Sequence, residues 1–240
     1  MPDVTEVIVN NADDGYDRET FYYGDYSSGA LASGSSTVYL RWWTGSDPAM
    51  SYQTRNAFFR FRTVPIPAGV TIDSAYLKLY YHSGSDYSGQ TLTVKGNDVD
   101  DATAPTTVLQ YRALDLTDAG VDWTVGSMSG GTQYTSPNIA SVISEIVGRA
   151  GWVENNNLQL LLKAPTTGTS SSDSFMIQFR SRNYSSAQAP ELVISYSEAT
   201  TTTTTEAPAS DDDTVYKSVI KAVQPAAFSL INTANTEGNR

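Results

Sequence analysis

The chain has 240 residues, of which 40% are hydrophobic, so it is long enough to bury a core. Its formal net charge of -11 at pH 7 repels a phosphate backbone and argues against nucleic acid as a partner. The absence of cysteine excludes disulfides, thiolate catalysis and zinc–cysteine sites. No signal-peptide pattern begins the chain, and no run approaches the ~18 apolar residues of a membrane span, so we expect no membrane partner.

Short runs of alternating apolar and polar residues recur along the chain, with Gly, Asn, Asp, Pro and Ser clusters between them. Each run predicts a strand with one buried and one solvent-facing side. In chain order, the predicted strands are residues 4–9, 37–43, 55–62, 74–82, 90–95, 158–163, 175–182 and 191–196. Eight short strands with long polar connections predict an all-β fold, an antiparallel two-sheet jelly-roll sandwich.

One short amphipathic helix is expected at residues 137–149. Ser136 is its predicted N-cap, Pro137 its first helical residue, and Gly151 lies just beyond its end. The residues with helical spacing on its apolar side are Ile139, Val142, Ile143, Ile146 and Val147. This stripe is expected to pack on the sandwich, with Glu145 and Arg149 in water.

The composition changes after the last predicted strand. Residues 1–198 are therefore assigned to the sandwich domain, and the Thr-, Ala-, Pro- and Asp-rich residues 199–213 to an extended linker. Residues 214–240 are predicted to be an attachment tail that is helical in part and needs a partner to bury its apolar side chains. Those side chains are Val215, Tyr216, Val219, Ile220, Val223, Phe228, Leu230 and Ile231.

Several of these segments resemble a known family. They are RNAFFRF at residues 55–61, VPIPAGVTIDSAYLKL at residues 64–79, ISEIVGRAGW at residues 143–152 and APELVISY at residues 189–196. Together they are similar to the DNRLRE-type jelly-roll domains over about residues 10–197. The resemblance implies a carbohydrate-binding-module-like fold, found in surface proteins, polysaccharide-acting enzymes and bacteriophage structural proteins, usually as a non-catalytic part. It implies a fold more than an activity.

Aromatic residues provide a hypothesis of sugar binding, because flat rings stack on the apolar face of a sugar. Core packing or loop anchoring is the alternative role for such residues. The two neighbouring tryptophans Trp42 and Trp43 must point to opposite sides of their strand, so at most one of them is core. The candidates for carbohydrate contact are Tyr22, Tyr23, Tyr26, Trp42, Trp43 and Trp123.

A cluster of oxygen-bearing side chains is a candidate calcium site. Asn97, Asp98, Asp100 and Asp101 offer the hard oxygen ligands that calcium prefers. A polar turn is the alternative interpretation, and no other cofactor is expected.

No catalytic residues are predicted. His82, the single histidine, lies on the expected solvent side of a strand without a visible orienting carboxylate. The segment GSMSG at residues 126–130 has Met128 where a nucleophilic serine would have to stand. Carboxylate-pair chemistry, as in a glycosidase, is not marked by any particular spacing.

Three functions remain open. The first is a non-enzymatic structural subunit of a viral particle, such as a bacteriophage capsid decoration, fibre or tail component, anchored to neighbouring subunits by its C-terminal tail. The second is a carbohydrate-binding or adhesion module with glycan partners, and the third is a polysaccharide hydrolase. The first predicts a location on the exterior of a virion and the others an extracellular surface. Homo-oligomerisation is compatible with all three functions, and a jelly roll has no sequence signature for the number of subunits.

Overall fold

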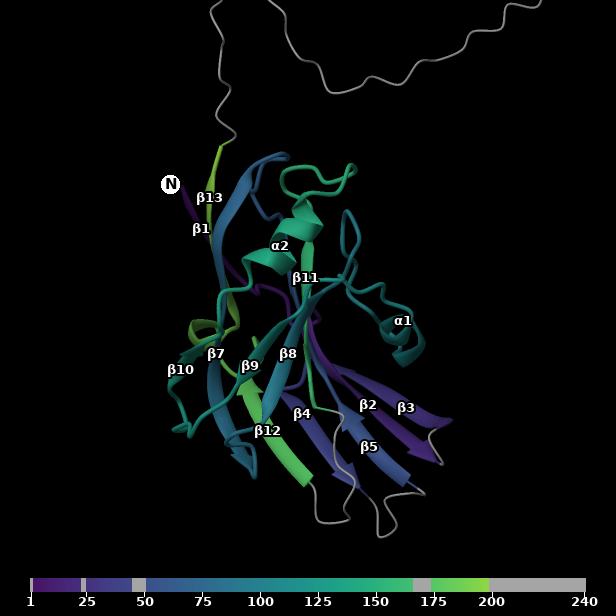
Figure 1. Ribbon diagram of the computed structural model, residues 1–240. Coiled ribbons are helices and arrows are strands. Elements are labelled where there is room, and N and C mark those ends of the chain that lie inside the picture. Colours follow the sequence, from purple (N-terminus) through teal and green to yellow (C-terminus); the bar gives the residue numbers. More distant parts are fainter. Residues whose placement is uncertain (1, 23–24, 45–50, 166–173, 199–240) are drawn as a thin grey trace, which may run out of the picture. The chain divides into compact units, whose positions relative to one another are not determined.

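The computed structural model describes residues 2–22, 25–44, 51–165 and 174–198. They form an antiparallel all-β domain, as the alternation in the sequence predicts (Figure 1). The strands are β1 (Asp3–Val7), β2 (Asp14–Tyr22), β3 (Asp25–Ser33), β4 (Thr37–Thr44), β5 (Ser51–Arg55), β6 (Ala57–Phe61), β7 (Thr71–Ser85), β8 (Thr91–Gly96), β9 (Val121–Thr124), β10 (Gln133–Thr135), β11 (Leu158–Lys163), β12 (Ser174–Arg180) and β13 (Glu191–Ser197). Two α-helices, α1 (Val108–Arg112) and α2 (Ala140–Val147), and the 3-10 turn Ser186–Gln188 complete the described elements.

All eight predicted strands are present, as β1, β4, β6, β7, β8, β11, β12 and β13. The sequence did not predict β2, β3, β5, β9 and β10. In β2 the polar Asp17 and Glu19 occupy buried positions, so this strand lacks the apolar alternation by which the others were found. The corrected fold therefore has more strands, and β2 is central to it.

The strands form one continuous hydrogen-bonded sheet that folds back on itself. One half has the order β1-β13-β7-β12-β4-β5, and the other has the order β6-β11-β8-β9. Strand β2 joins the halves, because it pairs with both β5 and β6, and β3 pairs with its other edge. Most neighbouring strands are distant in the sequence, which is typical of a jelly-roll-like sandwich rather than a meander.

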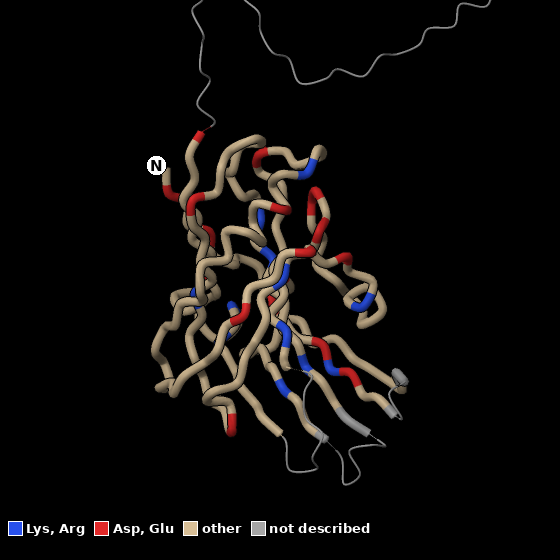
Figure 2. Tube along the Cα trace, in the orientation of Figure 1, with Lys and Arg blue, Asp and Glu red and all other residues tan. Residues whose placement is uncertain are grey.

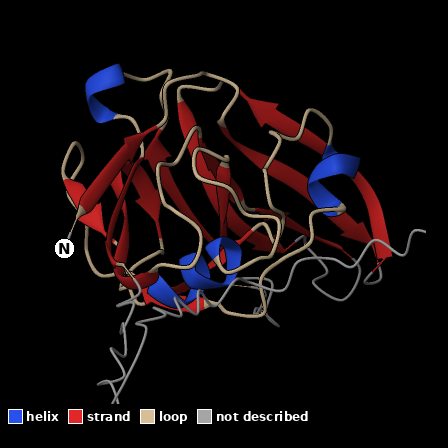
Figure 3. Ribbon diagram, turned by 90° about the horizontal axis from the view of Figure 1, so that it is seen from above, coloured by secondary structure: helices blue, strands red, loops and turns tan. Residues whose placement is uncertain are grey.

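The main hydrophobic core lies between the two halves. Trp123 of β9 stacks on Phe179 of β12, with 6.0 Å between the ring centres, although the two strands belong to opposite halves. Helix α2 contacts both β7 and β8 and so covers the core where the halves diverge. A Cβ atom at Gly96 of β8 would lie 2.5 Å from Ile146 Cδ1, so the glycine permits this close approach. Figure 3 shows the helices around the margin of the strands.

Helix α2 is shorter than expected. Its apolar stripe is buried as predicted, but it begins at Ala140, and neither Ser136 nor Pro137 has its predicted role. Ser136 Oγ instead accepts a hydrogen bond from Leu77 N of β7 at 3.0 Å. The polar residues before the helix therefore satisfy the backbone of β7.

The two charged residues of the helical segment are also not free in water. The Glu145 carboxylate accepts hydrogen bonds from the backbone N–H groups of Asp118 and Ala119. The Arg149 guanidinium pairs with Asp98 and Asp100. Both side chains tie the helical segment to the long loop between β8 and β9.

A second, smaller core lies on the outer side of β6 and β11. Phe58, Leu161 and Tyr111 of α1 are buried together there. The loop with α1 thus covers the face of β6 and β11 that points away from the main core. No helix in the described ranges is long and apolar enough to cross a membrane. The predicted linker, residues 199–213, and the predicted tail, residues 214–240, lie outside the described residues.

Candidate functional site

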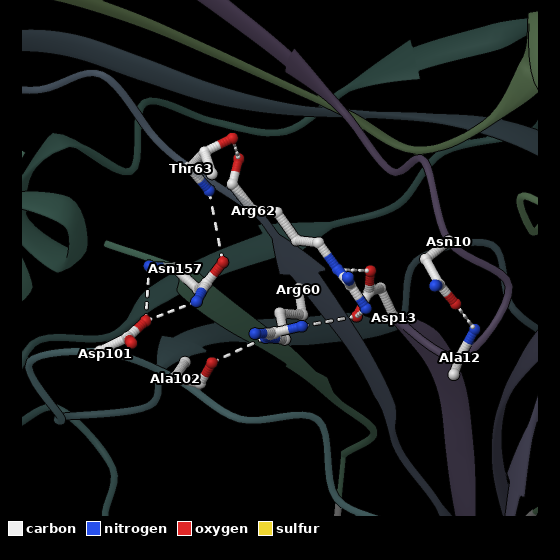
Figure 4. A network of polar contacts seen from close by, with 9 residues as sticks. All are labelled: Asn10, Ala12, Asp13, Arg60, Arg62, Thr63, Asp101, Ala102 and Asn157. Carbon is white, nitrogen blue, oxygen red and sulfur yellow. Dashed lines mark hydrogen bonds and ion pairs between the residues drawn. The ribbon is translucent and has the colours of Figure 1, made fainter. Parts of the chain in front are cut away.

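Charged side chains occur in two distinct settings, and the first is a buried network around Asp13. This carboxylate is fully buried and accepts hydrogen bonds from Arg60 Nη1 at 2.9 Å and Arg62 Nε at 2.5 Å (Figure 4). Arg60 Nε donates to the carbonyl of Ala102 at 2.7 Å. The network therefore joins the segment before β2, strand β6 and the loop between β8 and β9. Because an unpaired charge is costly inside a protein, these groups have a structural role.

Two further buried carboxylates lie on β2. Asp14 Oδ2 accepts a hydrogen bond from Arg182 N at 2.7 Å, whereas its Oδ1 has no hydrogen-bond partner. Asp17 accepts hydrogen bonds from the backbone and side chain of Asn56. Burial raises the pKa of both Asp14 and Asp17 to about 7, although their hydrogen bonds act in the opposite direction. These carboxylates thus titrate far above the range of an exposed aspartate.

The remaining carboxylate of β2 lies on the same face as Asp17 and contacts α1. Glu19 Oε1 lies 3.2 Å from Arg112 Nε. Burial raises the pKa of Glu19, and it also raises that of Tyr111, whose hydroxyl lies near the charges of Asp17 and Glu19. Side chains on this face of β2 therefore hold the loop with α1 in place.

The second setting is the opposite face of the same strand. Side chains alternate along β2, so Tyr16 and Arg18 point away from Asp17 and Glu19. In β4, Val38, Leu40 and Trp42 enter the core, and the residues between them point outward. The outward side chains form one surface, which we call the arginine–aromatic face: Tyr16, Arg18, Tyr39, Arg41, Trp43 and Arg55.

Cation–π contacts order this face. The guanidinium carbon of Arg55 lies 5.7 Å from the ring centre of Tyr16 and 5.4 Å from that of Tyr39. The two tyrosine rings are 4.9 Å apart. The guanidinium carbon of Arg41 lies 5.7 Å from the ring centre of Trp43. Such contacts contribute roughly 0.5–1 kcal/mol each at exposed sites, so they fix the side chains more than they stabilise the fold.

The charges on the face are all positive. Arg41 lies directly opposite Arg55 in the β4–β5 pairing. Burial lowers the pKa of Arg55, and the charges of Arg41 and Arg18 act in the same direction. In the part of the chain that the structure describes, no ion pair joins any of these three arginines to a carboxylate. The face is thus an unneutralised basic surface on an acidic protein.

The predicted sugar-contact residues differ in their exposure to solvent. Trp42 and Trp123 are each 6% exposed and belong to the core, so their rings do not present a face to a ligand. The prediction that they contact sugar is corrected accordingly. Trp43 is 37% exposed, and its ring belongs to the arginine–aromatic face. Tyr22 and Tyr26 lie in β2 and β3, but their side chains, like the whole of Tyr23, are outside the described residues.

The three aspartates among the predicted calcium ligands are paired with protein groups. Asp98 and Asp100 pair with Arg149 at 2.6 and 2.7 Å. Asp101 Oδ1 accepts hydrogen bonds from the backbone and side chain of Asn157 at 2.8 and 2.5 Å (Figure 4). Asn97 is buried and its backbone forms an isolated bridge with Leu116, but its side-chain Oδ1 has no hydrogen-bond partner in the described residues. Over the described ranges, no three acidic or histidine side chains gather as a metal site would require.

Sequence reasoning named Trp43 and missed the other five members of the face. The alternation of residues 37–43 contained the signal for two of them, since Tyr39 and Arg41 alternate with core residues. Of the remaining three, Tyr16 and Arg18 belong to β2, which was not predicted as a strand, and Arg55 is the first residue of the predicted strand 55–62 but lies in β5. Their proximity depends on non-local pairing of β2, β5 and β4.

A shallow depression adjoins the face. It has a volume of about 150 Å³ and is lined by Arg41, Ser85, Ser174, Phe175 and Met176. Pockets for drug-sized ligands measure roughly 300–1,000 Å³. The geometry therefore favours contact with an extended surface over enclosure of a small molecule.

No family model and no curated protein matches this chain. Three chains of solved structures match it. One is described as the crystal structure of infectious bursal disease virus VP2 subviral particle, with 12% sequence identity and a TM-score of 0.22. The match covers 80% of this chain and 58% of that chain, so this chain spans less than two thirds of it. A TM-score this low carries no argument for a shared fold or function.

Proposed function

We propose that this chain is a non-enzymatic structural subunit of an assembly, and that the assembly is a viral particle. In this proposal the β-sandwich is displayed on the particle, and the tail of residues 214–240, joined to it by the linker of residues 199–213, attaches it to neighbouring subunits. A bacteriophage capsid decoration, fibre or tail component is the most concrete form of the proposal. Its sequence basis is the threonine-rich segment followed by apolar residues.

The observation that carries the proposal is the way in which the chain leaves the sandwich. Strand β13 directly precedes the linker that leads to the proposed attachment tail, and it is hydrogen-bonded on both sides, to β1 and to β7. Side-chain bonds reinforce both pairings, from Ser195 Oγ to Asp3 and from Ser197 Oγ to Asp73. A load applied through the attachment tail would therefore act on two backbone ladders together, as suits an anchored domain.

Light scattering after size-exclusion chromatography tests the proposal on the full chain. The full chain is expected to form a species of several subunits, and the paired substitutions Ile220→Asp and Phe228→Asp are expected to shift it to monomers. Ser218→Asp is the matched control, because it adds a charge without removing an apolar side chain. A variant with both substitutions that keeps the mass of the unchanged chain contradicts attachment through this segment.

A second function, carbohydrate binding, is favoured by the half-exposed Trp43 with Arg41 over its ring. An aromatic ring beside a hydrogen-bond donor is suited to stack on a sugar and orient its hydroxyl groups. A glycan array should then show binding by the full chain and its loss in Trp43→Ala. An array without binding removes this candidate. No described observation favours the hydrolase alternative.

A further inference from the structure

The arginine–aromatic face brings three arginines close together without pairing them with carboxylates of the described residues. Arg18, Arg55 and Arg41 come from the adjacent strands β2, β5 and β4, and Arg41 lies directly opposite Arg55. Like charges on directly opposite positions of neighbouring strands destabilise a sheet. Within the described residues, no ion pair joins any of the three arginines to a carboxylate. Contact with a surface that bears carboxylates would therefore lower the free energy of this row of arginines.

The composition of the face is that of a protein–protein contact. Tryptophan, tyrosine and arginine dominate the energetics of interfaces, whereas lysine and acidic residues are depleted at their centres. The face consists of these three residue types, and its side chains are ordered by mutual cation–π contacts on a rigid sheet. Little ordering of side chains is then required on binding, which favours affinity.

A complementary surface exists on the same chain. Asp101, Asp115 and Asp118 are exposed on the loop between β8 and β9, and Asp122 is exposed on β9 itself. Figure 2 shows several acidic segments on the loops at the upper right, with basic segments beside them, and both basic and acidic segments among the strands below. The chain as a whole has 26 acidic residues against 15 Lys and Arg residues. A second copy thus carries the counter-charge that the face lacks.

We infer that the arginine–aromatic face binds the carboxylate-bearing loop between β8 and β9 of a second copy of this chain. The two surfaces are different, so the contact is heterologous and produces a ring if the rotation closes or a filament if it does not. This inference rests on the proposed role as an assembly subunit and goes beyond it. It assigns a subunit contact separate from residues 199–240.

Sedimentation velocity of the full chain over a wide range of concentrations tests the contact. The paired substitutions Arg41→Glu and Arg55→Glu are expected to weaken self-association about a hundredfold, because each removes an interface arginine worth about tenfold or more. The paired substitutions Asp115→Arg and Asp118→Arg should weaken it in the same way. Val153→Ala, which alters an exposed apolar residue away from the face, is the control and should associate normally.

A mixing experiment makes the test specific. An equimolar mixture of the two charge-reversed variants should associate again, since each provides the charge that the other lacks. Near-ultraviolet circular dichroism verifies that both variants are folded. If the variant with Arg41→Glu and Arg55→Glu is not folded, the variant with Arg41→Gln and Arg55→Gln takes its place. A full chain that is monomeric at every concentration overturns the inference, and so does a mixture that stays monomeric.

The failure of this inference can be distinguished from the failure of the proposed function. Association that survives both charge reversals but is lost with Ile220→Asp and Phe228→Asp overturns the contact and leaves the C-terminal attachment in place. Association that is lost with the charge reversals and survives in the C-terminal variant supports the contact and contradicts the attachment.

Discussion

Between Tyr16 and Glu19, the two faces of strand β2 carry charges of opposite sign in opposite environments. On one face Asp17 is buried against Asn56, and Glu19 pairs with Arg112 of the covering loop. On the other face Arg18 is exposed, in the same basic surface as Arg55 and Arg41. Charges that are buried must find partners within the fold, whereas exposed like charges are free to meet a partner outside it. We therefore assign a structural role to Asp17 and Glu19 and a binding role to the three arginines.

The largest expected effect separates the two neighbouring tryptophans of β4. Trp42→Ala should lower the free energy of unfolding by about 3–5 kcal/mol, because it removes a large side chain from the core. Trp43→Ala should lower it by less than about 1 kcal/mol, since its side chain lies on the arginine–aromatic face. Urea denaturation of both variants measures the difference. Equal losses would place both side chains in the same environment and break the comparison.

The next effect concerns the buried network around Asp13. Asp13→Ala leaves Arg60 and Arg62 without their shared carboxylate, and a loss of about 3 kcal/mol is expected. Asp86→Asn is the matched control, because Asp86 is exposed and forms no ion pair in the described residues. Its unfolding free energy should change by no more than about 0.5 kcal/mol. A small change in Asp13→Ala would show that the network is not structural.

The pH dependence of stability provides a third comparison. Asp14 and Asp17 have a pKa of about 7 in the folded protein against 3.8 for an ordinary aspartate, so the folded state binds their protons more tightly. Their contribution to stability is fully present below about pH 4 and is lost as the pH rises through about 7. The free energy of unfolding attributable to these residues should therefore be lower at pH 8 than at pH 5.

Asp14→Asn isolates one of these groups. Its amide keeps an acceptor for Arg182 N and removes the buried charge, so a gain of roughly 1–3 kcal/mol is expected at pH 8. The difference between the unfolding free energies at pH 5 and pH 8 should also become smaller than in the unchanged chain. Urea titrations at the two pH values measure both quantities. An unchanged difference would mean that Asp14 does not titrate in this interval.

The smallest effect is expected on the arginine–aromatic face. Arg55→Gln loses contacts with Tyr16 and Tyr39 but relieves repulsion by Arg41 and Arg18, so stability should change by less than about 1 kcal/mol. Thermal unfolding followed by circular dichroism is sufficient to check this. A large loss would make the arginine row part of the architecture and remove the distinction between the two faces of β2.

The fold was predictable wherever local patterns decide structure. Strand β7 shows the apolar alternation that places Ala75, Leu77 and Leu79 in the core, and the apolar stripe of α2 is equally clear. Strand β2 was not predictable, since its buried Asp17 is satisfied by Asn56, which is 39 residues away in the sequence. The start of α2 was misplaced for a related reason, because Ser136 binds the backbone of β7 instead of capping a helix.

The candidate site was predictable only in part. The neighbouring pair Trp42 and Trp43 had to divide between core and surface, and the β4 register shows which is which. The row of Arg18, Arg55 and Arg41 requires the pairing of three strands from separate parts of the chain. Sequence alternation determines which side of a strand a residue faces, but it does not determine which strands are neighbours.

The most direct test of the contact role of the arginine–aromatic face is hydroxyl-radical footprinting of the full chain at low and high protein concentration. Trp43 should be oxidised less at high concentration, where the face is covered by a second copy, while the exposed Tyr184 in the loop after β12 should be oxidised equally at both. Trp42 and Trp123 should react little at either concentration, because both belong to the core. Equal oxidation of Trp43 at the two concentrations, or a decrease shared equally by Tyr184, would contradict the account.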